Sequence, residues 1–130
     1  MTTREKAQAP TDVDRLFAER VNAGDVDGVV ALYEPTGTLI RQDRSSATGH
    51  AAIRDEIAAL VAMRPAMVMN VHHVVTGGDV ALLYNAWQAT LTPPGGGEPI
   101  TLAGRAREVV RRQADGTWLF VIDDPDTNAE

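Results

Sequence analysis

The stretch 21–33, VNAGDVDGVVALY, constrains the fold more than any other part of the 130-residue chain. It predicts the end of one helix followed almost directly by the start of another. Gly24 suits the left-handed residue that closes a helix, and Asp25 can cap the next helix by accepting from its free N–H groups. Apolar residues recur at helical spacing on both sides of this turn. Two amphipathic helices joined so tightly need an apolar partner surface, which we expect a sheet to provide.

Composition limits the class of protein. The length indicates one domain with a substantial core, and the contents of 44% hydrophobic and 23% charged residues are typical of globular proteins. A net charge of −6 argues against nucleic acid or an anionic membrane as a partner, because both need clustered cations. The chain has no cysteine, which excludes disulfides and thiolate chemistry and fits a cytoplasmic protein. No segment has the pattern of a signal peptide or the ~20 apolar residues of a membrane span.

Hydrophobic periodicity divides the chain into helices and strands. We expect residues 1–10 to form a flexible arm, 11–125 a single domain and 126–130 a tail. Helices are predicted at 11–23, 25–33 and 51–64, and strands at 38–40, 67–76, 80–92, 100–112 and 117–123. The polar segment 42–49 is predicted to be a loop, and Asp12 and Asp14 are interpreted as first-turn charges of the first helix. The order α-α-β-α-β-β-β-β indicates an α+β fold, with three N-terminal helices packed on a curved antiparallel sheet.

Several motifs resemble the nuclear-transport-factor-2-like superfamily, and within it the ketosteroid-isomerase-like and SnoaL-like proteins. The matching segments are 22–33, Gly49 with 52–54, 78–82, and 111–118 followed by Asp123 and Pro125. The last of these resembles bacterial members associated with enediyne clusters. The resemblance implies a cone-shaped barrel with a pocket between the concave face of the sheet and the helices. It also implies a homodimer through the outer sheet face. It is weak for function, because one fold hosts many activities.

The resemblance allows a comparison with steroid isomerases, position by position. Such an enzyme uses a carboxylate base and an oxyanion hole made of a tyrosine and a protonated aspartic acid. Here the tyrosine position falls on Phe17 and the base position on Arg41, and only the neutral-acid position keeps a carboxyl group, in Glu108. We therefore expect that the protein is not a steroid isomerase.

Strand alternation predicts which side chains face the pocket. If Glu108 faces it, Gly104, Ala106 and Val110 do so too. The resemblance places the following residues of the neighbouring strands on the same face: Met67, Met69, Val71, His73, Tyr84, Ala86, Gln88, Leu119, Val121 and Asp123. A β-bulge would reverse any of these orientations. The candidate acid–base residues are Glu108, Asp123 and His73. The candidate ligand contacts are Phe17, Tyr33, Met67, Met69, Tyr84, Gln88 and Val121.

The candidate polar groups have two interpretations. A histidine beside two carboxyl groups could perform general acid–base chemistry, because burial raises a carboxyl pKa towards neutrality. Alternatively, Glu108 and Asp123 pair with arginines such as Arg41 or Arg105 in a structural network. His72 and His73 are adjacent on a strand and point to opposite faces, so they cannot chelate one ion. We expect no metal and no other cofactor.

Trp87, Trp118, Phe120 and Ile122 have the parity opposite to the expected pocket residues, and Trp87 would instead line the pocket if the register slips. Together they predict an apolar outer sheet face that a homodimer would bury.

Three functions are compatible with the sequence. The first is a small-molecule-binding protein that holds an apolar ligand, for example a polyketide-like compound. The second is a proton-transfer enzyme, an isomerase, cyclase or dehydratase, that uses the pocket carboxyl groups. The third is a dimerisation module with a vestigial pocket. The missing isomerase base favours the first. A cavity lined by Glu108 and Asp123, with one raised carboxyl pKa, would favour the enzyme.

Overall fold

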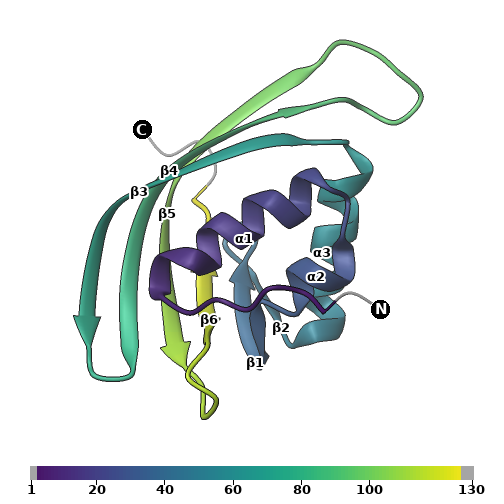
Figure 1. Ribbon diagram of the computed structural model, residues 1–130. Coiled ribbons are helices and arrows are strands. Elements are labelled where there is room, and N and C mark those ends of the chain that lie inside the picture. Colours follow the sequence, from purple (N-terminus) through teal and green to yellow (C-terminus); the bar gives the residue numbers. More distant parts are fainter. Residues whose placement is uncertain (1–2, 127–130) are drawn as a thin grey trace.

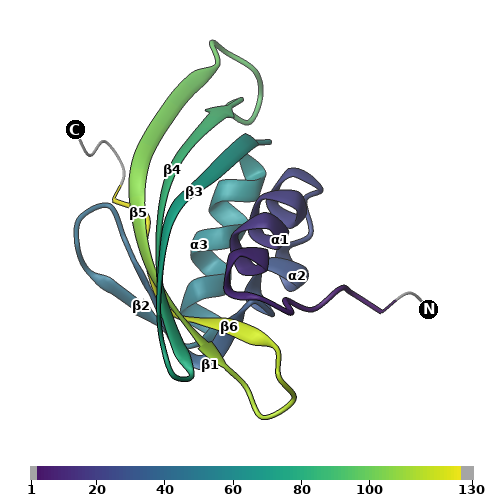
Figure 2. The same cartoon turned by 60° about the vertical axis from the view of Figure 1, so that its left-hand side comes forward.

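A computed structural model describes residues 3–126 as three helices and six strands (Figure 1). The elements are α1 (Pro10–Asn22), α2 (Val26–Val30), β1 (Tyr33–Ile40), β2 (Ser46–Thr48), α3 (His50–Ala62), β3 (Ala66–Gly77), β4 (Val80–Leu91), β5 (Ile100–Arg112) and β6 (Trp118–Asp124). One curved, unclosed sheet holds the strands in the order β2-β1-β6-β5-β4-β3, and the helices lie on its concave side (Figure 2). The predicted α+β fold is confirmed. The sheet is mixed rather than wholly antiparallel, since β1 and β6 run parallel.

The turn between the first two helices forms as predicted. Gly24 has φ +74°, and the Asp25 side chain accepts a 3.0 Å hydrogen bond from the Gly28 N–H. The second helix ends earlier than predicted, and the chain enters β1 at Tyr33. The reason is tertiary: the Tyr33 ring packs 4.9 Å from that of Phe120, and the Phe120 N–H donates to the Leu32 carbonyl at 2.8 Å.

Two segments are more ordered than the sequence predicts. The expected loop at 42–49 contains β2, which pairs with β1. The central residue of β2, Ala47, is fully buried. Residues 3–9, expected to form a flexible arm, lie along the body of the protein. Ala7 is buried there and its carbonyl accepts from the Trp118 N–H at 3.0 Å, while Arg4 pairs with Asp25 at 2.8 Å. Most of the predicted tail, 127–130, lies outside the described residues.

Three of the four side chains predicted to form an apolar outer face are core residues instead, and only Ile122 of the four is exposed. Trp87, Trp118 and Phe120 are 9%, 8% and 0% exposed and face the helices. The predicted parity of β4 is wrong by one residue, which reverses every side chain of that strand. In β6 the register shifts opposite Val109 and Val110. Phe120 and Asp123 therefore both point inwards, although they are three positions apart and regular alternation would place them on opposite faces.

After β6 the chain turns back across the inner face of β5 at Gly104. A Cβ atom at Gly104 would lie 2.7 Å from the Pro125 carbonyl oxygen and from the Trp87 indole nitrogen, so only glycine fits. The Trp87 indole N–H donates to the Pro125 carbonyl at 2.8 Å. This crossing brings Pro125 to the wall of the interior cavity.

Candidate functional site

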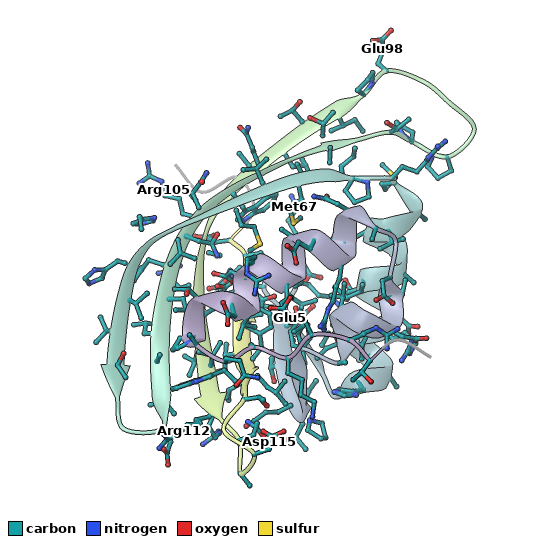
Figure 3. The ribbon with its side chains drawn as sticks, in the orientation of Figure 1. Glu5, Met67, Glu98, Arg105, Arg112 and Asp115 are labelled. Carbon is teal, nitrogen blue, oxygen red and sulfur yellow. The ribbon has the colours of Figure 1, made fainter. Side chains whose placement is uncertain are left out.

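A cavity of about 210 Å³ lies between the concave sheet face and the helices. Its wall is mainly apolar, and Figure 3 shows Met67 between α1 and the sheet. The apolar lining comprises Phe17, Leu39, Ile40, Ile57, Leu60, Met67, Met69, Trp87, Ala89, Leu91, Leu102, Ala106 and Pro125. Arg41, Gln42 and Glu56 lie at its partly exposed rim, and Glu108 and Asp123 are the polar groups of its buried wall. The cavity is therefore an apolar chamber with two carboxyl groups.

A larger groove, about 820 Å³, lies between the N-terminal segment and the β5–β6 hairpin. Its charged side chains form exposed ion pairs, including Arg4 with Asp25 and Lys6 with Asp115. Interactions within exposed ion pairs are weak, because water and salt screen them. We place the candidate site in the smaller cavity, because buried titratable groups line it.

The two cavity carboxyls belong to a buried carboxyl cluster, which we define as Asp14, Tyr33, Asn85, Glu108 and Asp123. These residues come from α1, β1, β4, β5 and β6, and none is more than 4% exposed. The Asn85 side-chain amide donates to Asp14 Oδ2 and to Glu108 Oε1, each at 3.0 Å. The Tyr33 hydroxyl donates to Asp123 Oδ2 at 2.5 Å. Five elements of the fold thus converge on one polar group in an apolar interior.

Burial dominates the electrostatics of this cluster. It raises the pKa of Glu108 well above its usual value, and the charges of Asp14 and Asp123 raise it further. Burial also raises the pKa of Asp123 to about 7, against the hydrogen bond from Tyr33, which lowers it. The pKa of Asp14 is raised by burial too. Burial therefore favours the neutral form of Glu108, while Asp123 changes its charge near neutrality.

The side chain of Asn85 joins two of the carboxyl groups, because its amide donates to Asp14 and to Glu108. Burial favours the neutral, protonated form of Glu108, and the charges of Asp14 and Asp123 favour it further. Among the described residues, Asp14 Oδ1 and Asn85 Oδ1 are buried and have no hydrogen-bond partner. The cluster therefore keeps two free acceptor sites.

The arrangement provides an acid and a base on one cavity wall. Asp123, with a pKa near neutrality, can accept or release a proton at physiological pH. Glu108 can donate a hydrogen bond or a proton because it stays neutral. Such a separation of two carboxyl pKa values by their environments is the usual way in which acid and base roles are assigned in an active site.

The predicted site residues fall into two groups. Phe17, Met67, Met69, Glu108 and Asp123 line the cavity. Tyr33 lies behind it and reaches it only through its hydrogen bond to Asp123. Val121, at the irregular point of β6, is half-buried and is not part of the lining.

The predicted orientation of the other three residues is wrong. Tyr84 and Gln88 alternate with the buried residues of β4 and therefore lie on the outer sheet face. His73 joins them there, because the register shift between Val71 and His73 turns the second half of β3 over. The rings of His73 and Tyr84 lie 5.6 Å apart on that face.

The sequence analysis missed Asp14, Asn85 and the inward position of Trp87. Asp14 was interpreted as a first-turn charge, yet it lies on the apolar face of α1, three residues before Phe17 and seven before Val21. Asn85 stands between Leu83 and Trp87 in the inward alternation of β4. A polar residue at an apolar position of an amphipathic pattern was the available signal.

The arginine network considered from the sequence is absent from residues 3–126. Arg41 pairs with Glu56 at 3.1 Å and donates to the Ser46 carbonyl, and Arg105 points away from the helices on the outer face (Figure 3). No cation is among the groups that shift the pKa values of Asp14, Glu108 and Asp123. Within the same residues, no cluster of three or more acidic, histidine or cysteine side chains could hold a metal ion. None of the helices described between residues 3 and 126 is long and apolar enough to cross a membrane.

A family model for the SnoaL-like domain matches residues 13–121, and the chain therefore belongs to the SnoaL-like family. Its fold is that of the NTF2-like, cystatin-like structures. Curated protein sequences include no relative that matches the chain.

Solved structures provide the other comparisons. A ketosteroid isomerase-like protein from Erwinia carotovora atroseptica has a TM-score of 0.80 and 20% identity, over 92% of this chain and 94% of that one. A candidate calcium/calmodulin-dependent protein kinase II association domain from Xanthomonas campestris has a TM-score of 0.77 and 21% identity, over 100% of this chain and 97% of that one. A candidate dehydratase of the NTF2-like family from Streptomyces avermitilis has a TM-score of 0.73 and 18% identity, over 88% of this chain and 90% of that one. At these identities the likeness establishes the fold alone.

The buried carboxyls predict an unusual pH dependence of stability. The pKa of Asp123 is about 7 in the folded protein against 3.8 ordinarily, so the folded state holds a proton that the unfolded chain releases between about pH 4 and 7. The free energy of unfolding therefore falls as the pH rises through this window. Asp123→Asn should leave stability near pH 4.5 almost unchanged and raise it at pH 8 by about 1–3 kcal/mol, measured by urea unfolding. Asp55→Asn, at an exposed carboxyl of α3, is the matched control and should leave the pH dependence of the free energy of unfolding unchanged. Equal effects of both variants, or a wild type more stable at pH 8 than at pH 5, would contradict the assigned ionisation.

Proposed function

We propose that the protein is an acid–base enzyme that transfers a proton to or from a small apolar molecule held in the cavity. The observation that carries this proposal is the pair of carboxyl groups on one wall of an apolar chamber, of which Glu108 stays neutral and Asp123 titrates near pH 7. Isomerases, cyclases and dehydratases share this requirement for a positioned acid and base. The printed descriptions of the Erwinia and Streptomyces proteins, isomerase-like and candidate dehydratase, fall in the same class.

Each member of the carboxyl cluster has a role in this proposal. Asp123 is the proton acceptor, and the Tyr33 hydroxyl positions it by binding one of its oxygens. Glu108 keeps its proton because it is buried beside two other carboxyls. Asn85 holds Glu108 and Asp14 together from the sheet side. The base differs from that of a steroid isomerase, whose base position is Arg41 here and pairs with Glu56 at the rim.

The size of the chamber limits the substrate. A volume of about 210 Å³ is smaller than the roughly 300–1,000 Å³ of cavities that hold drug-sized ligands. The substrate, or the part of it that reacts, is accordingly a compact apolar group. A binding-only protein could use the same chamber, but it would have no use for an ionisable Asp123.

A general reagent for buried bases tests this function without knowledge of the natural substrate. 5-Nitrobenzisoxazole is small and apolar; when a base takes its ring C–H proton, the N–O bond breaks, a nitrile forms and a coloured phenoxide is released. The protein should accelerate this reaction, and the rate should rise with pH through about 7 as Asp123 ionises. Asp123→Asn should reduce the rate by about 10²-fold or more, whereas Asp55→Asn, at an exposed carboxyl of α3 outside the cavity, should change it less than about twofold.

Two results would overturn the proposal. One is a rate no greater than that of acetate at equal concentration. The other is a rate that Asp123→Asn and Asp55→Asn lower equally, because the reaction would then not occur at Asp123. Saturable binding of the reagent without turnover would support the binding-only alternative.

We also propose that the chain forms a homodimer through its outer sheet face, where Ile122 is the one residue of the predicted apolar face that lies there. Val75, Leu82, Val109 and Ile122 are direct cross-strand partners and form one apolar row over β3, β4, β5 and β6. Val75 and Ile122 are 49% and 43% exposed. A contiguous apolar row on a sheet face favours burial against a second copy. The Xanthomonas relative, described as a candidate association domain, supports an assembling role for this fold.

A lysine in this row tests the dimer. Ile122→Lys places a charge in the proposed apolar row and should convert a dimer of the 13.9 kDa chain to a monomer in analytical ultracentrifugation. Val68→Lys, at an equally exposed valine outside the row, should leave the dimer intact. A monomeric wild type, or a dimer that survives Ile122→Lys, would refute this interface.

A further inference from the structure

Among the described residues, Arg41 is the one cation that lines the interior cavity. The Arg41 N–H donates to the Ser45 carbonyl at 2.8 Å, so the extended pairing of β1 continues to this residue. Strand alternation then turns the Arg41 side chain to the inner face, like that of Leu39 two positions before it. Leu39 is the register partner of Asp123, and two strand residues span about 7 Å. Arg41 therefore lies further towards the mouth than Asp123, and it is partly exposed whereas Asp123 is buried.

Arg41 uses only two of its three guanidinium nitrogens for contacts within the described residues. Its Nε donates to Glu56 Oε2 of α3 at 3.1 Å. Its Nη1 donates to the Ser46 carbonyl at 3.0 Å and to Ser45 Oγ at 3.3 Å, which holds the segment after β1 in place. No acceptor within residues 3–126 receives a hydrogen bond from Nη2. The rim of the cavity thus offers the two N–H groups of this nitrogen to a ligand.

The ion pair of Arg41 with Glu56 is single rather than bidentate. A guanidinium and a carboxylate often form two parallel hydrogen bonds, but here only Nε and Oε2 are joined. Glu56 Oε1 therefore remains an acceptor without a donor in the part of the chain that the structure describes. Gln42, the other polar residue of the rim, is neutral, so the rim offers a donor and an acceptor but carries no net charge.

These contacts favour a neutral polar group on the ligand. An anion would gain from Arg41 but be repelled by Glu56, and a cation would meet the reverse. A neutral group that accepts from Nη2 and donates to Oε1 gains from both, and it costs less than a charge to place beside an apolar chamber. The chamber of about 210 Å³ holds a compact group, so the polar end of a ligand can remain at the rim.

We propose that Arg41 and Glu56 recognise a neutral group of the substrate that both accepts and donates hydrogen bonds, a carboxamide or a hydroxyl, while the apolar body of the substrate occupies the chamber. This assignment rests on the proposed function, since it names the substrate class of the same cavity. Arg41 and Glu56 are binding residues in this scheme, and the proton transfer stays with Asp123.

Titrations followed by NMR test this inference with five probes that share one benzyl body. Phenylacetamide and 2-phenylethanol offer both a donor and an acceptor, methyl phenylacetate offers acceptors only, and phenylacetate and 2-phenylethylammonium are charged. The reporter is the Trp87 indole N–H at the cavity wall, and the Trp118 indole in the other groove is the internal control. At about pH 6, where Asp123 is mostly protonated, phenylacetamide or 2-phenylethanol should bind about 3–10-fold more tightly than the other three probes. The tighter of these two identifies the group.

Charge substitutions at the rim should redirect this preference. Glu56→Gln leaves Arg41 without its counter-ion and should raise the affinity for phenylacetate by about 2–5-fold. Arg41→Gln leaves Glu56 uncompensated and should raise the affinity for 2-phenylethylammonium by a similar factor. Asp55→Asn on α3 and Arg105→Gln on the outer face make the same changes of charge away from the cavity lining, and each should alter the affinities less than about 1.5-fold.

The outcomes separate this inference from the proposed function. If a charged probe or the ester binds the wild type most tightly, or if Glu56→Gln has no more effect than Asp55→Asn, the assignment of the rim is wrong; Glu56→Gln decides this even where Arg41→Gln does not fold. If no probe shifts Trp87 while 5-nitrobenzisoxazole still reacts through Asp123, the assignment of the rim is again wrong and the acid–base function stands. If the rim shows the expected preference but that reaction does not occur, the recognition site is supported and the acid–base function fails.

Discussion

The structure depends on three carboxyl groups placed in an apolar interior without a cation. Ionised carboxylates are strongly disfavoured in such surroundings, and proteins usually respond by pairing them or by keeping them protonated. Here burial favours the second course for Glu108, Asp14 accepts a hydrogen bond from Asn85, and Asp123 accepts one from Tyr33. At neutral pH the cluster contains a protonated carboxyl group, and this group distinguishes the cavity chemically from an ordinary apolar core.

The rest of the fold shields the cluster from solvent. The tight turn at Gly24 and Asp25 lets α1 and α2 lie together inside the curved sheet (Figure 1). Asp14 of α1 thereby contacts Asn85 of β4. The return of the chain across Gly104 brings Pro125 to the cavity wall beside Trp87. A site of this kind lowers the stability of the protein at neutral pH, and such a loss is a common consequence of a functional site that needs buried charge.

The sequence predicts the secondary structure of this arrangement better than the orientation of its strands or its tertiary contacts. The helices and long strands follow from periodicity, and Glu108 was found because its strand alternates regularly and keeps the neutral-acid position. Tyr84 and Gln88 were misplaced because an offset of one residue reverses a whole strand, and nothing in β4 alone fixes that offset. His73 was misplaced because a bulge in β3 depends on packing and not on a local motif. Asp14 could have been found, since an acidic residue on the apolar face of α1 is a visible anomaly, whereas its contact with Asn85 spans 71 positions and needs the folded chain.

The most direct test of the central claim is the titration of individual carboxyl groups by ¹³C NMR, with the Asp123 and Glu108 resonances assigned from Asp123→Asn and Glu108→Gln. The account predicts that Asp123 titrates at about pH 7 and that Glu108 keeps its proton at that pH. If both groups instead titrate near the ordinary values for Asp and Glu, about 3.9 and 4.3, the cluster holds no proton at neutral pH and the acid–base account of this cavity is wrong.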